Sequence, residues 1–375
     1  MKITKISVYP VSIPYKKPFH ISTGLAREGK HVIIKVHTDE GIVGVGEAAV
    51  IIPDRTGESQ EAITLAIRKT MGPMILGEDP FRIDRIMQKL EGMTHGKYGM
   101  LYSKAAIDHA LYDIMGKALG VPVCQLIGGC GRKTLTVGRS IGLGSPEEMA
   151  ERALELKKAG YRLLTVKGSP EPKEDIRRVE AVRKAVGDEF PLELDPNQGY
   201  PAHIAIPTLR AMEQYGLEMA EQPCPWWDWE GMAAVTAAID MPIAADEMVM
   251  NLADAMQVVK RKAADIITLK LVKSGGIYFS KKIAAVAEAA GLACSIGSMH
   301  TFGAGTAAIH HFVSATKEVE EPIGYGTPLD YFVDDIITEP IQLLDGTVDI
   351  SGKPGLGVEL DEEKLKKYSA EITVN

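Results

Sequence analysis

The order of apolar and polar residues divides the chain into three regions of different periodicity. From about Met1 to Glu47 the two kinds alternate, and HVIIKVHTDEGIVGVGEA predicts a β-hairpin that turns at residues 39–41. From about Ser59 to Leu119 apolar residues recur every three or four positions, most clearly in SKAAIDHALYDIMGKALG, which predicts amphipathic helices. Strands followed by helices predict a separate α+β lobe, which we place at residues 1–130.

From about Leu135 short β-rich runs alternate with amphipathic helical stretches. The runs LTVGRS, LLTVK, PLELD, LEMAE, IAADE, DIITLKL and ACSIGS are each followed by a helical pattern. Repeated β–α units predict a parallel sheet, and a parallel sheet of this length usually closes into a barrel. The fold class is therefore α/β, with the barrel at residues 131–342. We expect residues 343–375, which contain several glycine turns, to return to the first lobe.

Charged side chains end five successive strands of the predicted barrel. They are Lys167, Asp195, Glu221, Asp246 and Lys270, separated by 28, 26, 25 and 24 residues, each gap being about one β–α unit. The carboxyl ends of barrel strands meet at one rim, where active sites are built. A single residue of this kind would be read as an ordinary polar residue opening a loop, but five in register favour a site.

The types of these residues indicate a metal-assisted reaction. Three carboxylates at one point repel each other unless a cation lies between them, and ligands that offer only oxygen suit Mg²⁺ or Mn²⁺. The two lysines flank the carboxylates in strand order, which suits acid/base chemistry on opposite faces of a substrate. The proton α to a carboxylate can be removed when a divalent ion stabilises the resulting enediolate. Either lysine alone could instead be the salt-bridge partner of a metal-site carboxylate.

Several segments resemble the muconate-lactonizing enzyme branch of the mandelate racemase/muconate lactonizing enzyme family, within the enolase superfamily. They are TDEGIVGVGEA, KAAIDHALYDIMGKALGVPVCQLIGG, LDPNQGY, AEQP, AADE and ADIITLKLVKSGG, and the similarity covers nearly the whole chain. The resemblance implies a modified TIM barrel, (β/α)7β-like, with an α+β capping domain. It also implies roles for the five strand-end residues: Mg²⁺ ligands Asp195, Glu221 and Asp246, and acid/base residues Lys167 and Lys270. The mandelate racemase branch carries Asp where Lys270 stands, so the muconate-lactonizing branch is favoured.

Two departures from the family pattern affect the expected reaction. The family's second strand usually ends Lys-x-Lys, whereas this chain has Thr165-Val166-Lys167. The first lysine normally lowers the pKa of its neighbour and binds the substrate carboxylate, so Lys270 becomes the firmer candidate for the base. The family's dipeptide epimerases carry Asp-x-Asp near the eighth strand, but this chain has GYGTPLDYF there, which argues against dipeptide epimerisation.

Candidate substrate contacts come from the barrel rim and from two segments of the first lobe, residues 16–24 and 48–57, which we expect to close over the barrel mouth. The candidates are Thr165, Asn197, Glu247, His300, His20 and Ile51. His300 could bind or protonate the substrate, or be a hydrogen-bonded rim histidine. Trp226, Trp227 and Trp229 could form an aromatic wall for a cationic nitrogen, although packing of a loop is the favoured interpretation.

Composition excludes several other classes. The 375 residues carry a formal charge of −8 with no basic stripe, so nucleic-acid binding is not expected. No apolar run reaches the roughly 18 residues of a membrane helix, and the N-terminus lacks a signal peptide, so we expect a cytoplasmic protein without membrane partners. The four cysteines have no CxxC spacing, and neither a zinc site nor a disulfide framework is expected. A homo-oligomer is the default for such an enzyme.

Three functions remain open at the level of the sequence. The leading hypothesis is an isomerase, meaning a cycloisomerase, racemase or epimerase of a small carboxylate or amino-acid derivative. The second is a lyase that dehydrates a hydroxy acid or hydroxyproline-like compound through the same enediolate, with His300 or Lys167 as the acid. The third is a non-catalytic binding relative, against which the intact set of five charged residues argues.

Overall fold

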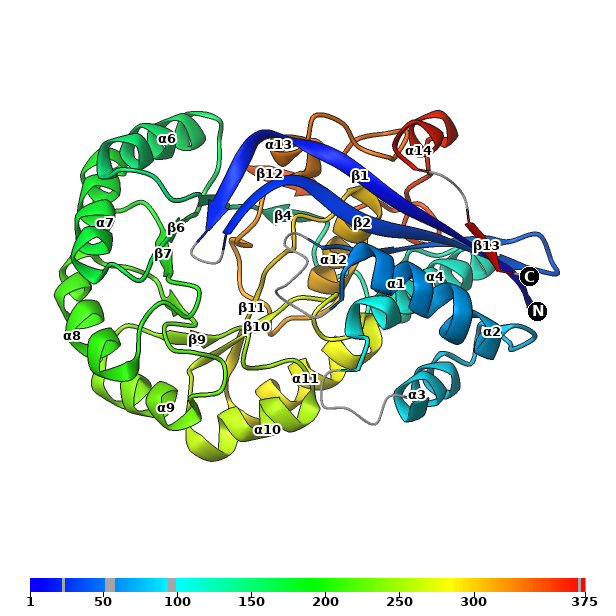
Figure 1. Ribbon diagram of the computed structural model, residues 1–375, viewed down its shortest axis with the longest axis horizontal. Coiled ribbons are helices and arrows are strands. Elements are labelled where there is room, and N and C mark those ends of the chain that lie inside the picture. Colours follow the sequence, from blue (N-terminus) through cyan, green and yellow to red (C-terminus); the bar gives the residue numbers. More distant parts are fainter. Residues whose placement is uncertain (22–23, 51–57, 94–98, 370–371, 375) are drawn as a thin grey trace.

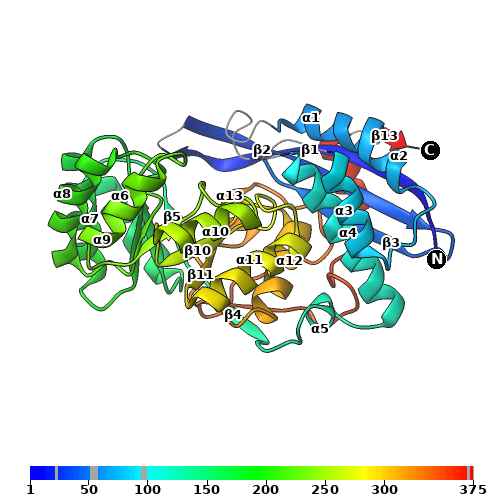
Figure 2. The ribbon, with the colours of Figure 1, turned by 90° about the horizontal axis from the view of Figure 1, so that it is seen from below.

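The computed structural model describes residues 1–21, 24–50, 58–93, 99–369 and 372–374. A β-sheet lobe with helices on one side lies along a parallel barrel (Figures 1 and 2). The fold class predicted from the sequence, an α/β barrel with an α+β capping lobe, is confirmed.

The first lobe is an antiparallel sheet of order β13-β1-β2-β3 covered by helices. Its strands are β1 (Ile3–Ile21), β2 (Gly24–Thr38), β3 (Val43–Ala48) and β13 (Ile372–Val374). Its helices are α1 (Gln60–Ala66), the π-helical turn η2 (Ile67–Met71), α2 (Gly72–Ile75), α3 (Ile83–Met93), α4 (Leu101–Leu119) and α5 (Val123–Leu126). The predicted hairpin with its turn at residues 39–41 corresponds to β2 and β3.

Close packing of β3 on α4 explains two glycines of the first lobe. A methyl group at Gly44 or Gly46 would collide with the carbonyl oxygen of Ala110 or Ala106. Only a strand without these side chains can approach the helix backbone so closely. The Asp113 carboxylate then accepts a hydrogen bond from the Val45 backbone N–H at 2.8 Å, which fixes the register of strand on helix.

Within the segment 16–24, which we expected to close over the barrel mouth, residues 16–21 and 24 lie at the paired ends of two strands. β1 continues to Ile21 and pairs with β2 from Gly24, with an irregularity in register between Pro14 and Phe19. The Leu143 backbone N–H donates to the His20 carbonyl at 3.0 Å, so the hairpin rests on the barrel. In Figure 1 it extends from the first lobe towards α6 (Pro146–Lys158).

The barrel is a seven-stranded parallel sheet of order β11-β10-β9-β8-β7-β6-β5. Its strands are β5 (Arg139–Ile141), β6 (Leu164–Lys167), β7 (Leu192–Asp195), β8 (Ala220–Glu221), β9 (Ile243–Ala245), β10 (Ile266–Leu269) and β11 (Ala293–Ile296). The helices after α6 are α7 (Pro172–Val186), α8 (Ala202–Met212), the 3₁₀ turn η3 (Glu213–Tyr215), α9 (Trp229–Ala238), α10 (Leu252–Arg261), α11 (Ile277–Ala290), α12 (Gly303–Ser314) and α13 (Pro328–Tyr331). Residues 319–323 bridge Cys294 on one side and Val137 on the other, and so close the ring.

Carboxylates of the first lobe cap two barrel helices and join the two parts. Glu47 of β3 is fully buried and accepts hydrogen bonds from the backbone N–H groups of Phe302 and Gly305, both at 2.7 Å, at the start of α12. Asp108 of α4 accepts one from the Ile277 N–H at 2.5 Å, at the start of α11. Because helix N-termini carry unsatisfied N–H groups and partial positive charge, both contacts are favourable.

The C-terminal segment contacts both parts of the molecule. β12 (Thr347–Asp349) pairs with β4 (Thr134–Thr136) below the barrel, α14 (Glu362–Tyr368) follows, and β13 pairs with β1. The predicted domain boundaries, 1–130, 131–342 and 343–375, stay a prediction. The pairing of β13 with β1 is consistent with a last segment that returns to the first lobe.

One expectation about cysteine is wrong. Cys124 and Cys130 form a disulfide, whereas Cys224 and Cys294 are free and buried. The bridge joins Cys124, within α5, to the residue that follows a turn through Gly128 and Gly129, both with positive φ. Among the described helices, none is long and apolar enough to cross a membrane.

Candidate active site

The parallel register places the charged strand ends side by side. Lys167 of β6 lies opposite Asp195 of β7, and its Nζ donates a hydrogen bond to the Asp195 Oδ2. The Asp195 side chain is fully buried and also accepts from the Asn197 backbone N–H at 2.8 Å. The predicted proximity of this lysine and carboxylate is thus observed.

Lys270, directly after β10, forms the second such pair. Its Nζ donates to Asp246 Oδ2 at 2.5 Å and lies 3.8 Å from Glu221 Oε1. Lys273 donates to the other oxygen of Asp246 at 2.9 Å. The sequence reasoning missed Lys273, although it lies in the motif ADIITLKLVKSGG.

Burial and neighbouring charge set the protonation of this cluster. Burial, and then the charge of Asp195, raises the pKa of the Glu221 carboxyl well above its ordinary value. Burial alone would raise the pKa of Asp246, but Lys270 and Lys273 outweigh it and hold that pKa low. Burial would lower the pKa of Lys270, but the Asp246 and Glu221 carboxylates outweigh it and raise that pKa.

The donor chemistry of the three carboxylates fits a hard divalent cation. All three side chains are buried, and Glu221 Oε1 is enclosed without a hydrogen bond. Enclosed carboxylate oxygens are the ligands that Mg²⁺ takes in proteins. Within the described residues no three acidic, histidine or cysteine side chains stand at metal-binding separation, and Asp195 and Asp246 are each paired with a lysine.

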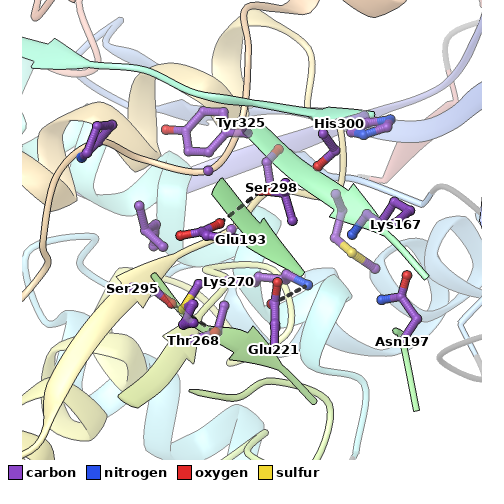
Figure 3. Close-up of a pocket in the computed structure, with 18 of the residues that line it drawn as sticks. Lys167, Glu193, Asn197, Glu221, Thr268, Lys270, Ser295, Ser298, His300 and Tyr325 are labelled. Carbon is purple, nitrogen blue, oxygen red and sulfur yellow. Dashed lines mark hydrogen bonds and ion pairs between the residues drawn. The ribbon is translucent and has the colours of Figure 1, made fainter. Parts of the chain in front are cut away.

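The two lysines line one cavity of about 60 Å³ (Figure 3). Further lining residues come from the barrel interior, the rim and the first lobe: Phe19, Ser140, Thr165, Glu193, Asn197, Met219, Glu221, Thr268, Ser295, His300, Gly324, Tyr325 and Tyr331. In Figure 3 the amino groups of Lys167 and Lys270 reach the same space from different strands.

The predicted substrate contacts divide into three groups. Thr165, Asn197 and His300 line this cavity, and Glu247 reaches it through a 3.4 Å hydrogen bond from the Asn197 amide. His20 lines a different cavity, of about 500 Å³. Ile51 lies outside the described residues.

The tryptophans after β8 are not a wall of this cavity. Trp226 and Trp227 are 41% and 63% exposed, and neither lines it. Trp229 is partly buried and packs against the barrel core. The favoured interpretation, loop packing, therefore holds for Trp229 alone.

His300 belongs to an aromatic cluster that covers the cavity. Its Nδ1 is 2.9 Å from the Tyr15 hydroxyl, and its ring stacks on Tyr331 at 3.8 Å and meets the edge of Phe19 at 4.6 Å. Burial, and then the charges of Arg139 and Lys167, lowers the pKa of His300 well below its ordinary value. The side chain is therefore a neutral imidazole at pH 7.

The sequence reasoning also missed Glu193, which lies two residues before Asp195 on the same face of β7. Its side chain is 92% buried, lines the cavity, and accepts a hydrogen bond from the Thr165 hydroxyl at 2.9 Å. Burial raises the pKa of Glu193 to about 7. The signal was available in the sequence, because Thr165 and Glu193 occupy the same strand position in successive β–α units.

Comparison with known proteins agrees with the barrel and its rim. The family described as "Mandelate racemase / muconate lactonizing enzyme, N-terminal domain" matches residues 3–128, and "Enolase C-terminal domain-like" matches residues 148–364. The chain belongs to the mandelate racemase/muconate lactonizing enzyme family of the enolase superfamily, as the sequence motifs predicted.

Relatives in this family are isomerases that align over nearly their full length. The N-succinyl-L-Arg/Lys racemase of Bacillus cereus is 35% identical, with 98% of each chain covered. The L-Ala-D/L-Glu epimerase of Bacillus subtilis is 36% identical, covering 96% of this chain and 97% of the relative. Muconate cycloisomerase 1 of Rhodococcus opacus is 32% identical, covering 98% and 99%. The predicted class, an enolase-superfamily isomerase enzyme, is confirmed.

Solved structures agree with the fold in detail. The Bacillus cereus N-succinyl Arg/Lys racemase superposes with a TM-score of 0.95 at 34% identity, with both chains fully covered. A dipeptide epimerase from Cytophaga hutchinsonii, solved with Mg and the dipeptide D-Ala-L-Val, superposes with a TM-score of 0.94 at 28% identity over the whole of both chains. These ligands belong to the relatives, and what this chain binds has to be argued from its own residues.

Proposed function

We propose that the protein is a Mg²⁺-dependent isomerase that removes and returns the proton α to the carboxylate of a small substrate. The observation that carries the proposal is the placement of Lys167 and Lys270 on one cavity, each bonded to a buried carboxylate of the proposed ligand set. We assign Asp195, Glu221 and Asp246 as the metal ligands, with Mn²⁺ as an alternative ion.

The protein residues have separate parts in this reaction. When bound, Mg²⁺ supplies positive charge that stabilises the enediolate and offsets the carboxylates that otherwise raise the pKa of Lys270. Lys270 Nζ takes the α-proton on one face, and Lys167 Nζ returns a proton on the other. Lys273 holds Asp246 in place, while Phe19, His300 and Tyr331 keep water from the reacting carbon.

An isomerase is favoured over a lyase by the pair of lysines. A racemase or epimerase needs one acid/base group on each face, and both lysines are present. A dehydratase would need an acid beside the leaving hydroxyl. His300 is neutral, and its Nδ1 is engaged by Tyr15, so it is a poor candidate for that acid. The named relatives are racemases, epimerases and cycloisomerases, which supports the same choice.

Proton exchange in D₂O, followed by NMR with Mg²⁺ present, tests the proposal. We expect deuterium to enter the α position of one substrate class and both stereoisomers to form. Lys270→Ala should abolish exchange of one stereoisomer while the protein still folds and binds metal. Lys167→Ala should abolish exchange of the other. Loss of the same stereoisomer in both variants would contradict the two-face assignment.

We further propose that the protein works in the cytoplasm as a homo-oligomer on a small-molecule carboxylate, without nucleic-acid or membrane partners. The formal net charge of −8 supports the proposal that the protein does not bind nucleic acid. Light scattering at micromolar concentration measures the oligomer, and a monomer would overturn that part.

A further inference from the structure

A polar layer lies beneath the two lysines inside the barrel. Alternation along a strand puts residues i and i−2 on the same face, so Thr165, Glu193, Thr268 and Ser295 stand one layer below Lys167, Asp195, Lys270 and Gly297. The register confirms that they are neighbours in pairs: Thr165 with Glu193, and Thr268 with Ser295. Bulky branched apolar side chains usually fill this part of a barrel. Hydroxyls and a carboxylate in their place indicate that this layer has a function other than packing.

The layer opens into the cavity rather than being sealed beneath it. Ser140, Thr165, Glu193, Thr268 and Ser295 all line the same 60 Å³ space as the lysines. Figure 3 shows the Glu193 carboxylate on the same side of the pocket as Ser295 and Tyr325. Gly324 borders the Glu193 carboxylate, because a methyl group added there would stand 3.7 Å from Glu193 Oε2.

Glu193 is the acidic side chain in this layer that the protein leaves without an ionic partner. Its hydrogen-bond donor is the neutral Thr165 hydroxyl, and in the described part of the chain no Lys, Arg or His nitrogen lies within 4.0 Å of it. Lys167 and Lys270, the nearby cations, are bonded to Asp195 and Asp246 instead. A buried carboxylate without a partner is costly, and a cationic ligand group would remove that cost.

We infer that the Glu193 carboxylate, with Thr165, is a subsite for the cationic nitrogen of the substrate, which is therefore a small amino or imino acid in its zwitterionic form. This inference rests on the proposed function, because it needs the substrate carboxylate at the layer of the lysines. An ammonium group at Glu193 donates to the carboxylate and to the neighbouring hydroxyl oxygens. A second anionic group, as in a muconate or an N-succinyl amino acid, would be repelled there.

The acidic residue near the eighth strand does not add a charge to this cavity. Asp330, the acidic residue of GYGTPLDYF, does not extend the site, because it caps α13 through Thr327 and pairs with Arg139 at 3.4 Å.

The test uses pairs of ligands that differ in the nitrogen and little else. Alanine is compared with lactate, and proline with tetrahydrofuran-2-carboxylate, alongside N-succinylalanine and cis,cis-muconate. Saturation-transfer NMR measures binding of each compound to the Mg²⁺-loaded protein, and α-proton exchange in D₂O measures turnover. Glu193→Gln removes the charge at constant shape, and Glu189→Gln, on the exposed surface before β7, is the matched control.

We expect the nitrogen compound of at least one pair to bind at least about tenfold more tightly than its oxygen partner. This preference should vanish in Glu193→Gln and persist in Glu189→Gln. The inference is overturned if the wild-type protein prefers the oxygen or the anionic compounds, if neither member of any pair binds, or if Glu193→Gln keeps the preference. The wild-type comparison decides the matter even if Glu193→Gln does not fold.

The two proposals can fail separately. Conversion of muconate to its deuterated lactone, or α-proton exchange of N-succinylalanine, without turnover of the nitrogen compounds would retain the isomerase function and overturn the cationic subsite. Binding of the nitrogen compounds without any α-proton exchange would retain the subsite and count against the isomerase.

Discussion

Gly297 at the end of β11 leaves the space through which the Lys270 side chain reaches the cavity. A methyl group at Gly297 would stand 2.5 Å from Lys270 Cε and 3.2 Å from its Cγ. The first contact is far below van der Waals separation and the second is a few tenths of an ångström too close, and the lysine is held at its tip by Asp246. The absence of a side chain on one strand therefore determines where the proposed base on the neighbouring strand can lie.

This contact predicts that Gly297→Ala lowers turnover without unfolding the protein. Displacing Lys270 by about 1 Å should cost roughly 100-fold in kcat, since proton transfer depends steeply on geometry. The rate of α-proton exchange, the Mg²⁺ affinity and the circular dichroism spectrum should be measured together. Only the exchange rate is expected to change. Gly92→Ala, at a helical position where an added methyl group meets nothing within 4 Å, is the control. A normal kcat in Gly297→Ala would show either that Lys270 is not the base or that Gly297 does not fix the position of its side chain.

The ligand assignment predicts the behaviour of Asp195→Asn. Replacing a charged oxygen ligand with an amide should weaken Mg²⁺ binding by about 10- to 100-fold by calorimetry, and should reduce the stabilisation that excess Mg²⁺ gives to the fold. Asp349→Asn, at an exposed position on β12, should leave both unchanged. Equal Mg²⁺ affinity in wild type and Asp195→Asn would remove Asp195 from the ligand set.

The strand-end residues could be predicted from the sequence because two simple periods locate them. Alternation identifies each short strand, and the spacing of about 25 residues between Asp195, Glu221 and Asp246 identifies the repeat. Once the strands are parallel, their carboxyl ends must share a rim. Rotamers do not follow from such periods, so the sequence offered the pairing of a lysine with a metal-site carboxylate only as an alternative, and the structure shows it at Asp195 and Asp246.

Other features depended on contacts between distant residues. Glu193 shares its strand position with Thr165, 28 residues earlier, but the sequence does not show that this layer opens into the cavity. Pro14 and Pro18 interrupt the alternation in the first strand, yet pairing with β2 keeps residues 19–21 extended. The Cys124–Cys130 bridge depends on a turn whose two glycines take positive φ, which cysteine spacing cannot reveal.

The contact between the first lobe and α12 predicts a loss of stability in Glu47→Gln. The Glu47 carboxylate accepts from two backbone N–H groups and from His31 Nδ1 at 2.9 Å, and an amide offers only one acceptor oxygen. We expect a loss of about 1–3 kcal/mol in the free energy of unfolding, measured with urea. Glu28→Gln, at a half-buried position of β2 where the carboxylate pairs with Lys30 at the surface, should cost nothing measurable. An unchanged urea midpoint in Glu47→Gln would argue that this cap does not contribute to stability.

Buried neutral histidines on α12 predict that the fold weakens in mild acid. Burial, and then the charge of His311, lowers the pKa of His310 to about 3, and burial lowers the pKa of His311 to about 4. Below pH 6.5 these histidines bind protons in the unfolded chain but stay neutral in the folded protein. Their full contribution to stability is therefore present above pH 6.5, and it is lost as the pH falls towards their pKa values in the folded protein. At pH 5 the loss from His310 alone is about 2 kcal/mol.

His310→Phe should remove that part of the acid sensitivity. Phe can keep the ring stacking that His310 makes with Tyr325 at 6.2 Å, but it has no proton to bind. The difference in unfolding free energy between pH 7.5 and pH 5 should therefore shrink by about 2 kcal/mol in this variant. His203→Gln, at an exposed position of α8, should keep the wild-type difference. If His310→Phe loses as much stability in acid as the wild type does, then His310 is protonated in the folded state near its ordinary pKa, and the acid sensitivity has another source.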